Sequence, residues 1–498
     1  MTNICKEGGM IEKPKGEYWA ICSGCLGRGK KSRRLTKKAK LRYQSELDQY
    51  EKTKGKKVEP LRPKGHLYAC PDCNGSGLIP SIQPSLANGE KYPRVAIIGG
   101  GIGGVALAVA CLHRGIPFTL YERDDNFDAR SQGYGLTLQQ ASKAIDGFGI
   151  SFLDQGVVST RHLVHTTTGK VLGEWGVRKW KGSVTGYSPK RSNVHIARQS
   201  LRLALLKQLR GHESVQWGHQ LIDFKQTQNK EVELHFLVNG KKKQETADLL
   251  VGADGIRSIV RSLLIGDDIK PLRYLGCIVI LGICPLSAIG SVDSTLLDSA
   301  TVFQTANGNE RIYMMPYTSD KIMWQLSFPM LESDAKVLSG QGPKALKEEA
   351  CHRTQWHVPI PQIIVNTPEG QISGYPVYDR ELLGGESLQS AGIVTLIGDA
   401  AHPMSPFKGQ GANQALLDAL ALARAIYSGC QYLPWRNIDI RRHILNGFEE
   451  EMLVRSASKV KDSADAAQFL HSALVLQEGD QPRGTCFKNA SHIPKPDR

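Results

Sequence analysis

A glycine-rich turn between two apolar segments constrains the fold of this chain more than any other feature. Residues 95–98, Val-Ala-Ile-Ile, are typical of a buried strand, and Gly99-Gly100-Gly101-Ile102-Gly103-Gly104 follows directly. In the spacing GxGxxG, the first glycine permits a tight turn, the second lets a pyrophosphate approach the backbone, and the third lets a helix pack closely. We expect that helix over residues 105–112 and a second strand over residues 118–121, which together predict a β-α-β unit.

The end of the second predicted strand supports dinucleotide binding. Glu122 stands there, 18 residues after Gly104, where a carboxylate accepts hydrogen bonds from a ribose, and Arg123 follows it. The N-terminus of the intervening helix offers free N–H groups and a positive dipole end to phosphates. The pattern does not choose between NAD and FAD.

Length and composition fit a soluble protein of several domains. The 498 residues allow about three domains at roughly 150 residues each. A content of 41% hydrophobic and 22% charged residues is typical of soluble globular proteins. The net charge is +15, but residues 1–90 hold 18 Lys and Arg against 9 Asp and Glu. The basic excess is therefore largely a property of the N-terminal region.

That region carries two copies of one cysteine pattern, CxxCxGxG. Cys22 and Cys25 open the first copy, and Cys70 and Cys73 open the second, with 44 residues between the pairs. Two CxxC knuckles supply the four thiolates of a tetrahedral zinc site, and the glycines permit tight turns beneath the metal. The pattern resembles half of a DnaJ-type cysteine-rich domain, which implies one zinc ion but no chaperone activity.

The insert between the cysteine pairs is basic. A helix is expected from residue 36 to about residue 52, because Leu35, Ala39, Tyr43, Leu47 and Tyr50 recur at three- and four-residue steps. An anionic partner of the insert is one interpretation, and a solvated basic helix is the other. The cations concerned are Lys30, Lys31, Arg33, Arg34, Lys37, Lys38 and Lys40.

Later patterns predict further sheets. Strands are expected over residues 221–225, 232–238 and 247–252, forming a small meander in which Asn239-Gly240 makes a hairpin turn. Residues 274–378 carry repeated strand signals and predict an antiparallel sheet, while residues 392–397 predict a buried strand and residues 411–426 a long helix.

Two further motifs decide between the dinucleotides. One is Asp254-Gly255 within LLVGADGIRSIVR, and the other is Gly398-Asp399 within LIGDAAHP. Both resemble motifs of the single-component FAD-dependent aromatic hydroxylases, the p-hydroxybenzoate hydroxylase family, and the resemblance covers about residues 94–426. It implies an α/β fold: a Rossmann-like FAD-binding domain with a parallel sheet and a β-meander, and a substrate domain built on an antiparallel sheet, preceded here by the small zinc module.

The resemblance also implies domain boundaries. The expected parts are a zinc module with its basic insert (1–81), a linker (82–92), a discontinuous FAD-binding domain (93–160, 191–268 and 386–430), a substrate domain (161–190 and 269–385), C-terminal helices (431–476) and a flexible tail (477–498).

Individual residues receive roles from the same resemblance. Asp399 is implied to bind the ribityl or ribose hydroxyls of FAD, Asp254 to lie near the pyrophosphate, and Arg198 to touch FAD. His402 corresponds to a position that is chiefly structural. The full set of expected cofactor-binding residues is Gly99, Gly101, Gly103, Gly104, Glu122, Arg123, Arg198, Asp254, Asp399, Pro406, Gly409, Gly411 and Ala412.

The implied activity is monooxygenation of an aromatic or similarly electron-rich small molecule. NADH or NADPH would reduce FAD, and oxygen would reach the substrate through a flavin C4a-hydroperoxide. No residue is singled out as catalytic. Possible substrate contacts, each also readable as an ordinary sheet residue, are Arg191, His195, Tyr274, Arg311, Tyr313, Trp324 and Gln325.

Two alternatives remain open. The zinc module can belong to a binding or scaffold protein that retains a flavin fold without turnover. Halogenases and reductases share the glycine and Gly-Asp motifs, although Met323-Trp324 only loosely matches the halogenase tryptophan segment.

A cytoplasmic setting is expected. The sequence has no charged start followed by an apolar core, which is the pattern of a secretory signal. No apolar run approaches the roughly 20 residues that span a bilayer. Four paired cysteines in a zinc pattern, with Cys111, Cys277 and Cys284 inside apolar runs, favour a reducing compartment.

Overall fold

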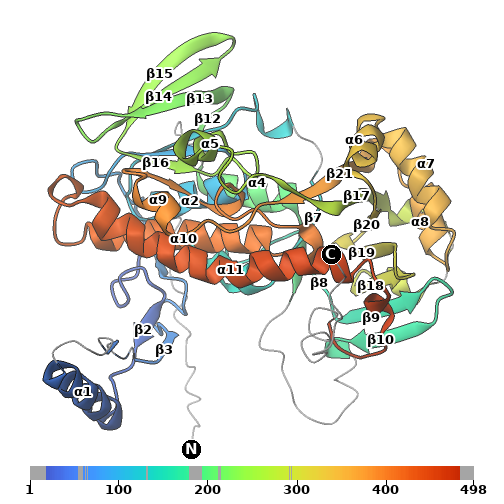
Figure 1. The fold of residues 1–498 in the computed structure, drawn as a ribbon, viewed down its shortest axis with the longest axis horizontal. Coiled ribbons are helices and arrows are strands. Elements are labelled where there is room, and N and C mark those ends of the chain that lie inside the picture. Colours follow the sequence, from blue (N-terminus) through green and yellow to red (C-terminus); the bar gives the residue numbers. More distant parts are fainter. Residues whose placement is uncertain are drawn as a thin grey trace, which may run out of the picture.

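The computed structural model describes residues 18–482, apart from residues 54–59, 62, 64, 130–132, 179–192, 211–214, 291 and 293. Figure 1 shows long helices at the centre, a twisted three-stranded sheet above them, a larger sheet backed by helices at the right, and the N-terminal module at the lower left. Arg191 and residues 483–498 of the expected tail lie outside the described residues.

The central layer is a five-stranded parallel sheet in the order β12-β6-β5-β16-β22. Its strands come from distant parts of the sequence: Val215–Gln216, Phe118–Tyr121, Val95–Ile98, Leu249–Gly252 and Val394–Leu396. Helices α2 (Ile102–Leu112) and α10 (Gly411–Gly429) pack against this sheet and against each other. The resemblance to the FAD-binding fold is thus confirmed, including the discontinuous parallel sheet.

One of the three strands expected in the meander lies in the parallel sheet instead. The meander consists of β13 (His219–Gln226), β14 (Val232–Val238) and β15 (Lys241–Ala247). The expected strand over residues 247–252 is instead the central parallel strand β16, buried at all four positions. Strand β15 escaped prediction because its residues, Lys-Lys-Lys-Gln-Glu-Thr-Ala, lie on an exposed edge and show no apolar alternation.

The larger sheet has seven strands in the order β10-β9-β18-β19-β20-β17-β21. All neighbouring pairs are antiparallel except β9 with β18, which is parallel. The strands span Val171–Trp175, Arg161–Thr166, Thr301–Ala306, Arg311–Thr318, Lys321–Pro329, Arg273–Pro285 and Ile372–Asp379.

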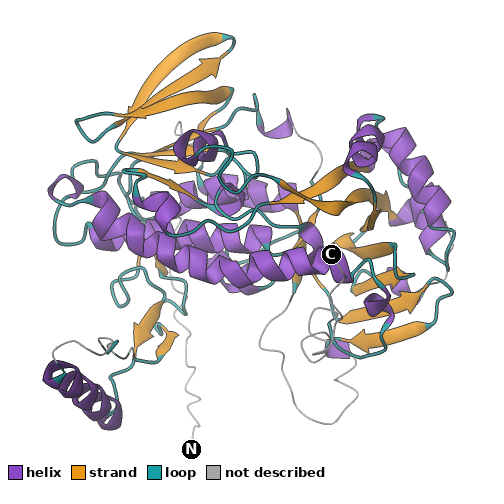
Figure 2. Cartoon of the chain, in the orientation of Figure 1, coloured by secondary structure: helices purple, strands orange, loops and turns teal. Residues whose placement is uncertain are grey.

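Helices cover one face of this sheet, as Figure 2 shows at the right. They are α6 (Glu332–Gly340), α7 (Pro343–Arg353) and α8 (Ile360–Val365). Apolar residues of these helices form one buried cluster with alternate residues of β17, β19 and β20, such as Ile312 and Trp324. The opposite face of the sheet is thereby directed toward the FAD-binding part.

Smaller elements join the two parts. Strands β7 (Gly135–Leu138), β8 (Val157–Val158) and β11 (Val194–Ala197) form a three-stranded sheet, and α4 (Arg198–Gln208) begins directly after β11. Short helices α5 (Ile259–Ile265) and α9 (Glu386–Gln389) flank the parallel sheet. The long C-terminal helix α11 (Asn446–Phe469) lies beside α10.

The N-terminal module is built from two short hairpin-like ladders and one helix. Strand β1 (Tyr18–Ile21) pairs with β4 (Leu78–Ser81), and β2 (Lys30–Ser32) pairs with β3 (Leu67–Ala69). Helix α1 (Lys37–Lys52) begins at the expected place, with the Thr36 side chain accepting a hydrogen bond from the Ala39 N–H. None of its residues is fully buried, but the apolar stripe of Ala39, Tyr43, Leu47 and Tyr50 is half-buried.

Candidate active site

A cavity of about 560 Å³ lies where the carboxyl ends of the parallel strands meet the uncovered face of the seven-stranded sheet. In open parallel sheets, ligands bind outside the carboxyl ends of the strands. Eight of the thirteen expected cofactor contacts line this cavity: Gly101, Gly103, Arg198, Asp399, Pro406, Gly409, Gly411 and Ala412.

The glycine-rich turn places the N-terminus of α2 at the cavity wall. The helix begins after Gly101 without a side-chain cap, so the N–H groups of its first turn remain free for a ligand. Gly99 has φ +106°, a conformation that favours glycine. A Cβ on Gly104 would stand 1.9 Å from the Gly99 carbonyl oxygen, so the helix can pack this closely on the turn only because residue 104 is a glycine.

A second uncapped helix N-terminus faces the same cavity. Helix α10 begins at Gly411 with no side-chain cap at Gln410. The Asn413 side chain fixes this turn: its Oδ1 accepts hydrogen bonds from the backbone N–H groups of Gln139 and Ala141, and its Nδ2 donates to the carbonyls of Thr137 and Gly409. Two positive helix ends therefore converge on one cavity, which suits a cofactor with negative charge.

Asp399 and Arg198 carry opposite charges into the cavity. Asp399 follows β22, and its exposed surface faces the cavity. Surrounding protein raises the pKa of the Asp399 carboxyl by desolvation, while the charges of His402 and Arg198 oppose this shift. Arg198 begins α4, and its guanidinium stacks near the Tyr134 ring. A hydroxyl-rich chain lying here would find an acceptor in Asp399 and a donor in Arg198.

His402 stabilises the turn at residues 398–402 and does not face the cavity. Its Nε2 lies 2.7 Å from Asp418 Oδ2, which also accepts the Gly398 N–H at 2.8 Å, while Arg455 donates to Asp418 Oδ1. Burial disfavours charge on both groups, yet their attraction raises the pKa of His402 and lowers that of Asp418. His402 is fully buried and is absent from the cavity wall.

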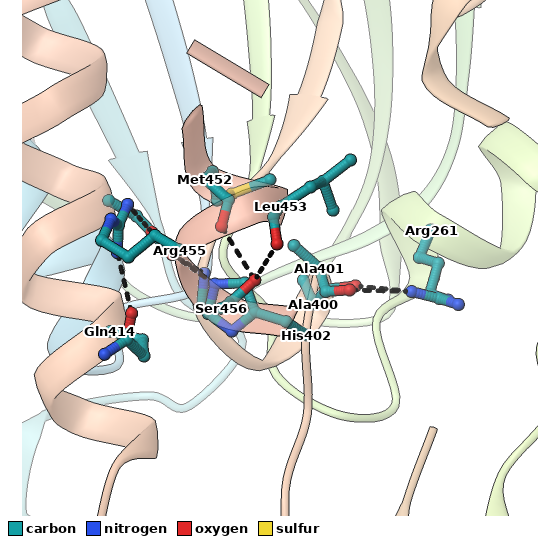
Figure 3. A network of polar contacts seen from close by, with 11 residues as sticks. Arg261, Ala400, Ala401, His402, Gln414, Met452, Leu453, Arg455 and Ser456 are labelled. Atoms are coloured by element: carbon teal, nitrogen blue, oxygen red, sulfur yellow. Dashed lines mark hydrogen bonds and ion pairs between the residues drawn. The ribbon is translucent and has the colours of Figure 1, made fainter. Parts of the chain in front are cut away.

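Arg261 holds the same loop from the other side, as Figure 3 shows. Its Nη1 donates to the carbonyls of Ala400 and Ala401 at 3.3 Å each. Arg261 belongs to α5, which follows Asp254, so this contact ties the two aspartate motifs together. Desolvation lowers the pKa of Arg261 to about 10, and it stays charged at neutral pH.

The remaining expected cofactor residues lie behind the cavity wall. The Asp254 carboxylate accepts hydrogen bonds from the Ser258 hydroxyl and from the Ile259 N–H at the start of α5. Glu122 accepts the Gly100 N–H at 2.7 Å through Oε2. Gly99 and Gly104 form the turn itself, and Arg123 follows Glu122 on the surface. The cavity lining therefore excludes five expected residues: Gly99, Gly104, Glu122, Arg123 and Asp254.

The seven-stranded sheet contributes the other half of the cavity. Arg311, Tyr313 and Met315 of β19 line it, together with Met323 and Gln325 of the paired strand β20. Of the expected substrate contacts, Arg311, Tyr313, Gln325 and His195 therefore lie at the cavity. Trp324 points to the helix-covered face and donates to Thr367 Oγ1, and Tyr274 donates to the Met330 carbonyl.

Other cavity residues were not anticipated from the sequence. They are polar or aromatic residues on loops and on strands β9 and β21: Tyr134, Gln139, His162, Arg257, Tyr375 and Tyr378. Alternation with a period of two separates the two faces of β19 and β20, so it helps to locate the cavity residues on those two strands. Nothing in the sequence alone says that β9 and β21 end at the same cavity.

Arg311 has an unusual electrostatic setting. It is 5% exposed, its Nε donates to the neutral Gln304 Oε1 at 2.8 Å, and among the described residues no carboxylate forms an ion pair with it. Desolvation lowers its pKa to about 10, so the guanidinium is still charged at neutral pH. The guanidinium also lies 5.0 Å from the centre of the Tyr313 ring. A buried cation at a cavity wall without a carboxylate partner favours an acceptor group on a ligand.

The two histidines near Arg311 are neutral at physiological pH. Burial lowers the pKa of His195 to about 3 and that of His162 to about 4. His195 Nδ1 lies 3.0 Å from Thr137 Oγ1, and its Nε2 has no hydrogen-bond partner in the described part of the chain. His195 is fully buried at the cavity wall, and this nitrogen is itself buried.

A separate cluster brings the four predicted metal ligands together. The Sγ atoms of Cys22, Cys25, Cys70 and Cys73 lie within 4.8 Å of one another, and all four residues are buried. The Cys22–Cys70 and Cys25–Cys73 Sγ distances are 4.0 and 3.7 Å. A zinc tetrahedron with Zn–S bonds of about 2.3 Å has edges of about 3.8 Å, so the cluster fits this geometry.

Backbone geometry around the cysteines follows a pseudo-twofold pattern. Gly29 N–H donates to Cys25 Sγ and Gly77 N–H donates to Cys73 Sγ, both at 3.2 Å. Cys22 N–H donates to the Gly77 carbonyl, and Cys70 N–H donates to the Gly29 carbonyl, both at 2.9 Å. The repeat seen in the sequence is therefore a structural repeat whose halves hold each other.

Comparisons with known proteins agree with this geometry. The family model described as "FAD binding domain" matches residues 92–429. The aurachin C monooxygenase/isomerase of Stigmatella aurantiaca is 31% identical over 333 residues, which make up 67% of this chain and 80% of that protein. The 6-hydroxynicotinate 3-monooxygenase of Pseudomonas fluorescens is 27% identical, with 68% and 83% covered.

Solved structures resemble the chain in fold. The 2,6-dihydroxypyridine-3-hydroxylase of Arthrobacter nicotinovorans has a TM-score of 0.62 at 20% identity, covering 82% of this chain and 98% of that one. Klebsiella pneumoniae HpxO in complex with FAD and uric acid has a TM-score of 0.62 at 19% identity, covering 78% and 93%. In the described part of the chain, no helix combines the length and apolarity required to cross a membrane.

Proposed function

Because the chain belongs to the FAD-dependent aromatic monooxygenases, we propose that it hydroxylates an aromatic ring bearing an anionic or strong acceptor group, with NADH or NADPH as reductant. The observation that carries the substrate assignment is Arg311, a buried cation at the cavity wall without a carboxylate partner among the described residues. An acceptor on the ligand would complete this site.

FAD fits the other half of the cavity. The free N–H groups at the start of α2 would hold the pyrophosphate, and the turn at Pro406 and Gly409 with the start of α10 would lie against the ring system. Asp399 and Arg198 would bind its hydroxyl-bearing chain. When bound, FAD would supply the redox chemistry, in which a hydride from NAD(P)H reduces O2 so that one oxygen atom enters the substrate and the other leaves as water.

The protein would position the substrate between the two halves. Arg311 would anchor its acceptor group, and Tyr313, next but one along β19, would pack beside the ring. Anchoring of this kind aligns the reacting carbon with the cofactor.

The Cys22, Cys25, Cys70 and Cys73 cluster would hold one zinc ion in a closed, structural site, because four protein thiolates leave no open position. Reduced thiols are needed for this role, so we infer a cytoplasmic setting. The module would then stabilise the enzyme. The competing interpretation is a binding or scaffold protein that retains the flavin fold without turnover.

Matched ligands test the substrate proposal. Binding of an aromatic carboxylate and of its neutral amide is measured through the visible spectrum of bound FAD, in the wild type and in Arg311→Gln. Loss of a buried charge partner costs about 2–5 kcal/mol, which corresponds to roughly a 30- to 4,000-fold loss for the carboxylate. The amide should change only a few-fold. Equal losses for both ligands, or none, would contradict the assignment.

A further inference from the structure

Two arginines of the FAD-binding part lie against the cysteine cluster. Arg114 follows the end of α2, and its Nη2 donates to the Gly27 carbonyl at 3.4 Å. Arg424 stands near the end of α10; its Nε donates to the Gly27 carbonyl at 3.1 Å and its Nη2 to the Ser76 carbonyl at 3.5 Å. Gly27 belongs to the first cysteine knuckle and Ser76 to the second, so Arg424 bridges both.

The two arginines form no direct ion pair with a carboxylate within the described protein. Arg114 is 3% exposed, its Nη1 donates to the Ala110 carbonyl at 2.9 Å, and its Nε has no hydrogen-bond partner among the described residues. Neither arginine forms an ion pair with a carboxylate in the part of the chain that the structure describes, although the charge of Glu451 reaches Arg424. Burial and the repulsion from Arg424 lower the pKa of Arg114 to about 9.

A loaded metal site would supply the missing charge. Four thiolates and one divalent ion carry a net charge of about −2, which equals and opposes the charge of the two guanidinium groups. The C-terminal ends of α2 and α10 also carry partial negative charge, so an anionic cluster would be repelled there without intervening cations. Arg114 and Arg424 stand between the helix ends and the knuckles.

We propose that Arg114 and Arg424 form the outer shell of the metal site, and that metal binding joins the N-terminal module to the ends of α2 and α10. The inference rests on the proposed zinc site and adds a role for it. The same two helices present their opposite ends, at Gly101 and Gly411, to the FAD cavity. The metal centre therefore stabilises, from the far end, the two helices that form the cofactor site.

Further contacts show how close the module lies to the body. The Arg210 guanidinium stacks 4.0 Å from the Tyr18 ring, and the Ser85 hydroxyl contacts the carbonyls of both Trp19 and His113. Arg210 touches the module away from the knuckle carbonyls. Its contact makes it a matched control, since its loss removes an interface cation without touching the cysteine turns.

Zinc affinity of the full chain tests the outer shell. Zinc release to a chromophoric chelator is measured for the wild type, Arg114→Gln, Arg424→Gln, Arg424→Lys and Arg210→Gln. Outer-shell changes lower metal affinity about 10- to 100-fold, so we expect this loss for both Gln variants and wild-type affinity for Arg210→Gln. Arg424→Lys should retain most of the affinity, because it keeps the charge. Wild-type affinity in both Gln variants, or a Lys variant as weak as the Gln variant, would overturn the proposal.

Hydrogen exchange of the wild-type chain gives a second readout that needs no variant. Removal of zinc should increase amide exchange in the last turns of α2 and α10 as well as in the knuckles. Unchanged exchange at these helix ends would overturn the coupling. A purified wild-type chain that binds no zinc would instead remove the zinc site itself, and the two failures are thereby distinguished.

Discussion

Asp418→Asn should destabilise the protein and do so more at low pH than at high pH. Asp418 is fully buried and joins three donors: the Gly398 N–H, His402 Nε2 and Arg455 Nη2. Removing one member of a buried charge pair costs about 3–5 kcal/mol. We expect about 3 kcal/mol at pH 8, because the Arg455 side chain is 21% exposed and His402 can release its proton.

The pH dependence follows from the histidine. In the wild type the pKa of His402 is raised above its unfolded value, so its contribution is fully present below about pH 6.5 and is lost as pH rises through the folded pKa. In Asp418→Asn, burial and the charge of Arg455 disfavour protonation of His402, and only the charge of Asp399 opposes them. We therefore expect His402 to stay neutral in the fold, so that protonation of the unfolded chain opposes folding at low pH. One pH unit below 6.5 adds about 1.4 kcal/mol.

Denaturant unfolding followed by circular dichroism at pH 8 and pH 5.5 measures both effects. Asp465→Asn, which changes an exposed carboxylate on α11, serves as the control and should lie within about 0.5 kcal/mol of the wild type. A loss below about 1 kcal/mol at both pH values, or an equal loss at both, would refute the account of this network.

Three further substitutions test the site and the module. Asp399→Ala should weaken FAD binding about 10-fold or more, measured by fluorescence titration, because it removes the carboxylate that faces the cavity; full FAD occupancy would contradict this role. Gly104→Ala places a Cβ 1.9 Å from the Gly99 carbonyl oxygen and should lower the melting temperature by several degrees, and an unchanged melting curve would show that the turn can yield. Gly29→Ala, at φ +69° and with a Cβ 2.2 Å from the Gly75 carbonyl, should weaken zinc binding in a chelator competition; retained affinity would count against the interlocked knuckles.

Local patterns predicted the backbone elements of the glycine-rich half of the cavity well. The strand at 95–98, the glycine turn and the helix after it are fixed by contiguous residues, and so is the turn at Gly398-Asp399. Asp254 shows the limit of transferring a motif from a family. The motif located the loop, but it did not predict that the Asp254 side chain accepts the Ile259 N–H at the start of α5. Short-range sequence specifies where a backbone turns better than it specifies what a side chain contacts.

The substrate half depends on the pairing of distant strands. Trp324 and Gln325 are neighbours in sequence and must face opposite sides of β20, and only the position of α6–α8 decides which side is the core. Strand β15 was missed for a similar reason, since an exposed lysine-rich edge has no apolar signal. The arginine pair behind the cysteines joins residues 114 and 424 to residue 27, a contact between parts of the chain that no local pattern connects.

The visible spectrum of the purified full chain during anaerobic reduction tests the central claim most directly. With FAD bound, NADH or NADPH should bleach the flavin bands, and an aromatic carboxylate that carries a ring hydroxyl should accelerate bleaching relative to its amide. Admission of O2 should then yield a hydroxylated product. A chain that binds no flavin even with added FAD, or a bound flavin that neither coenzyme reduces with any aromatic present, would contradict the account.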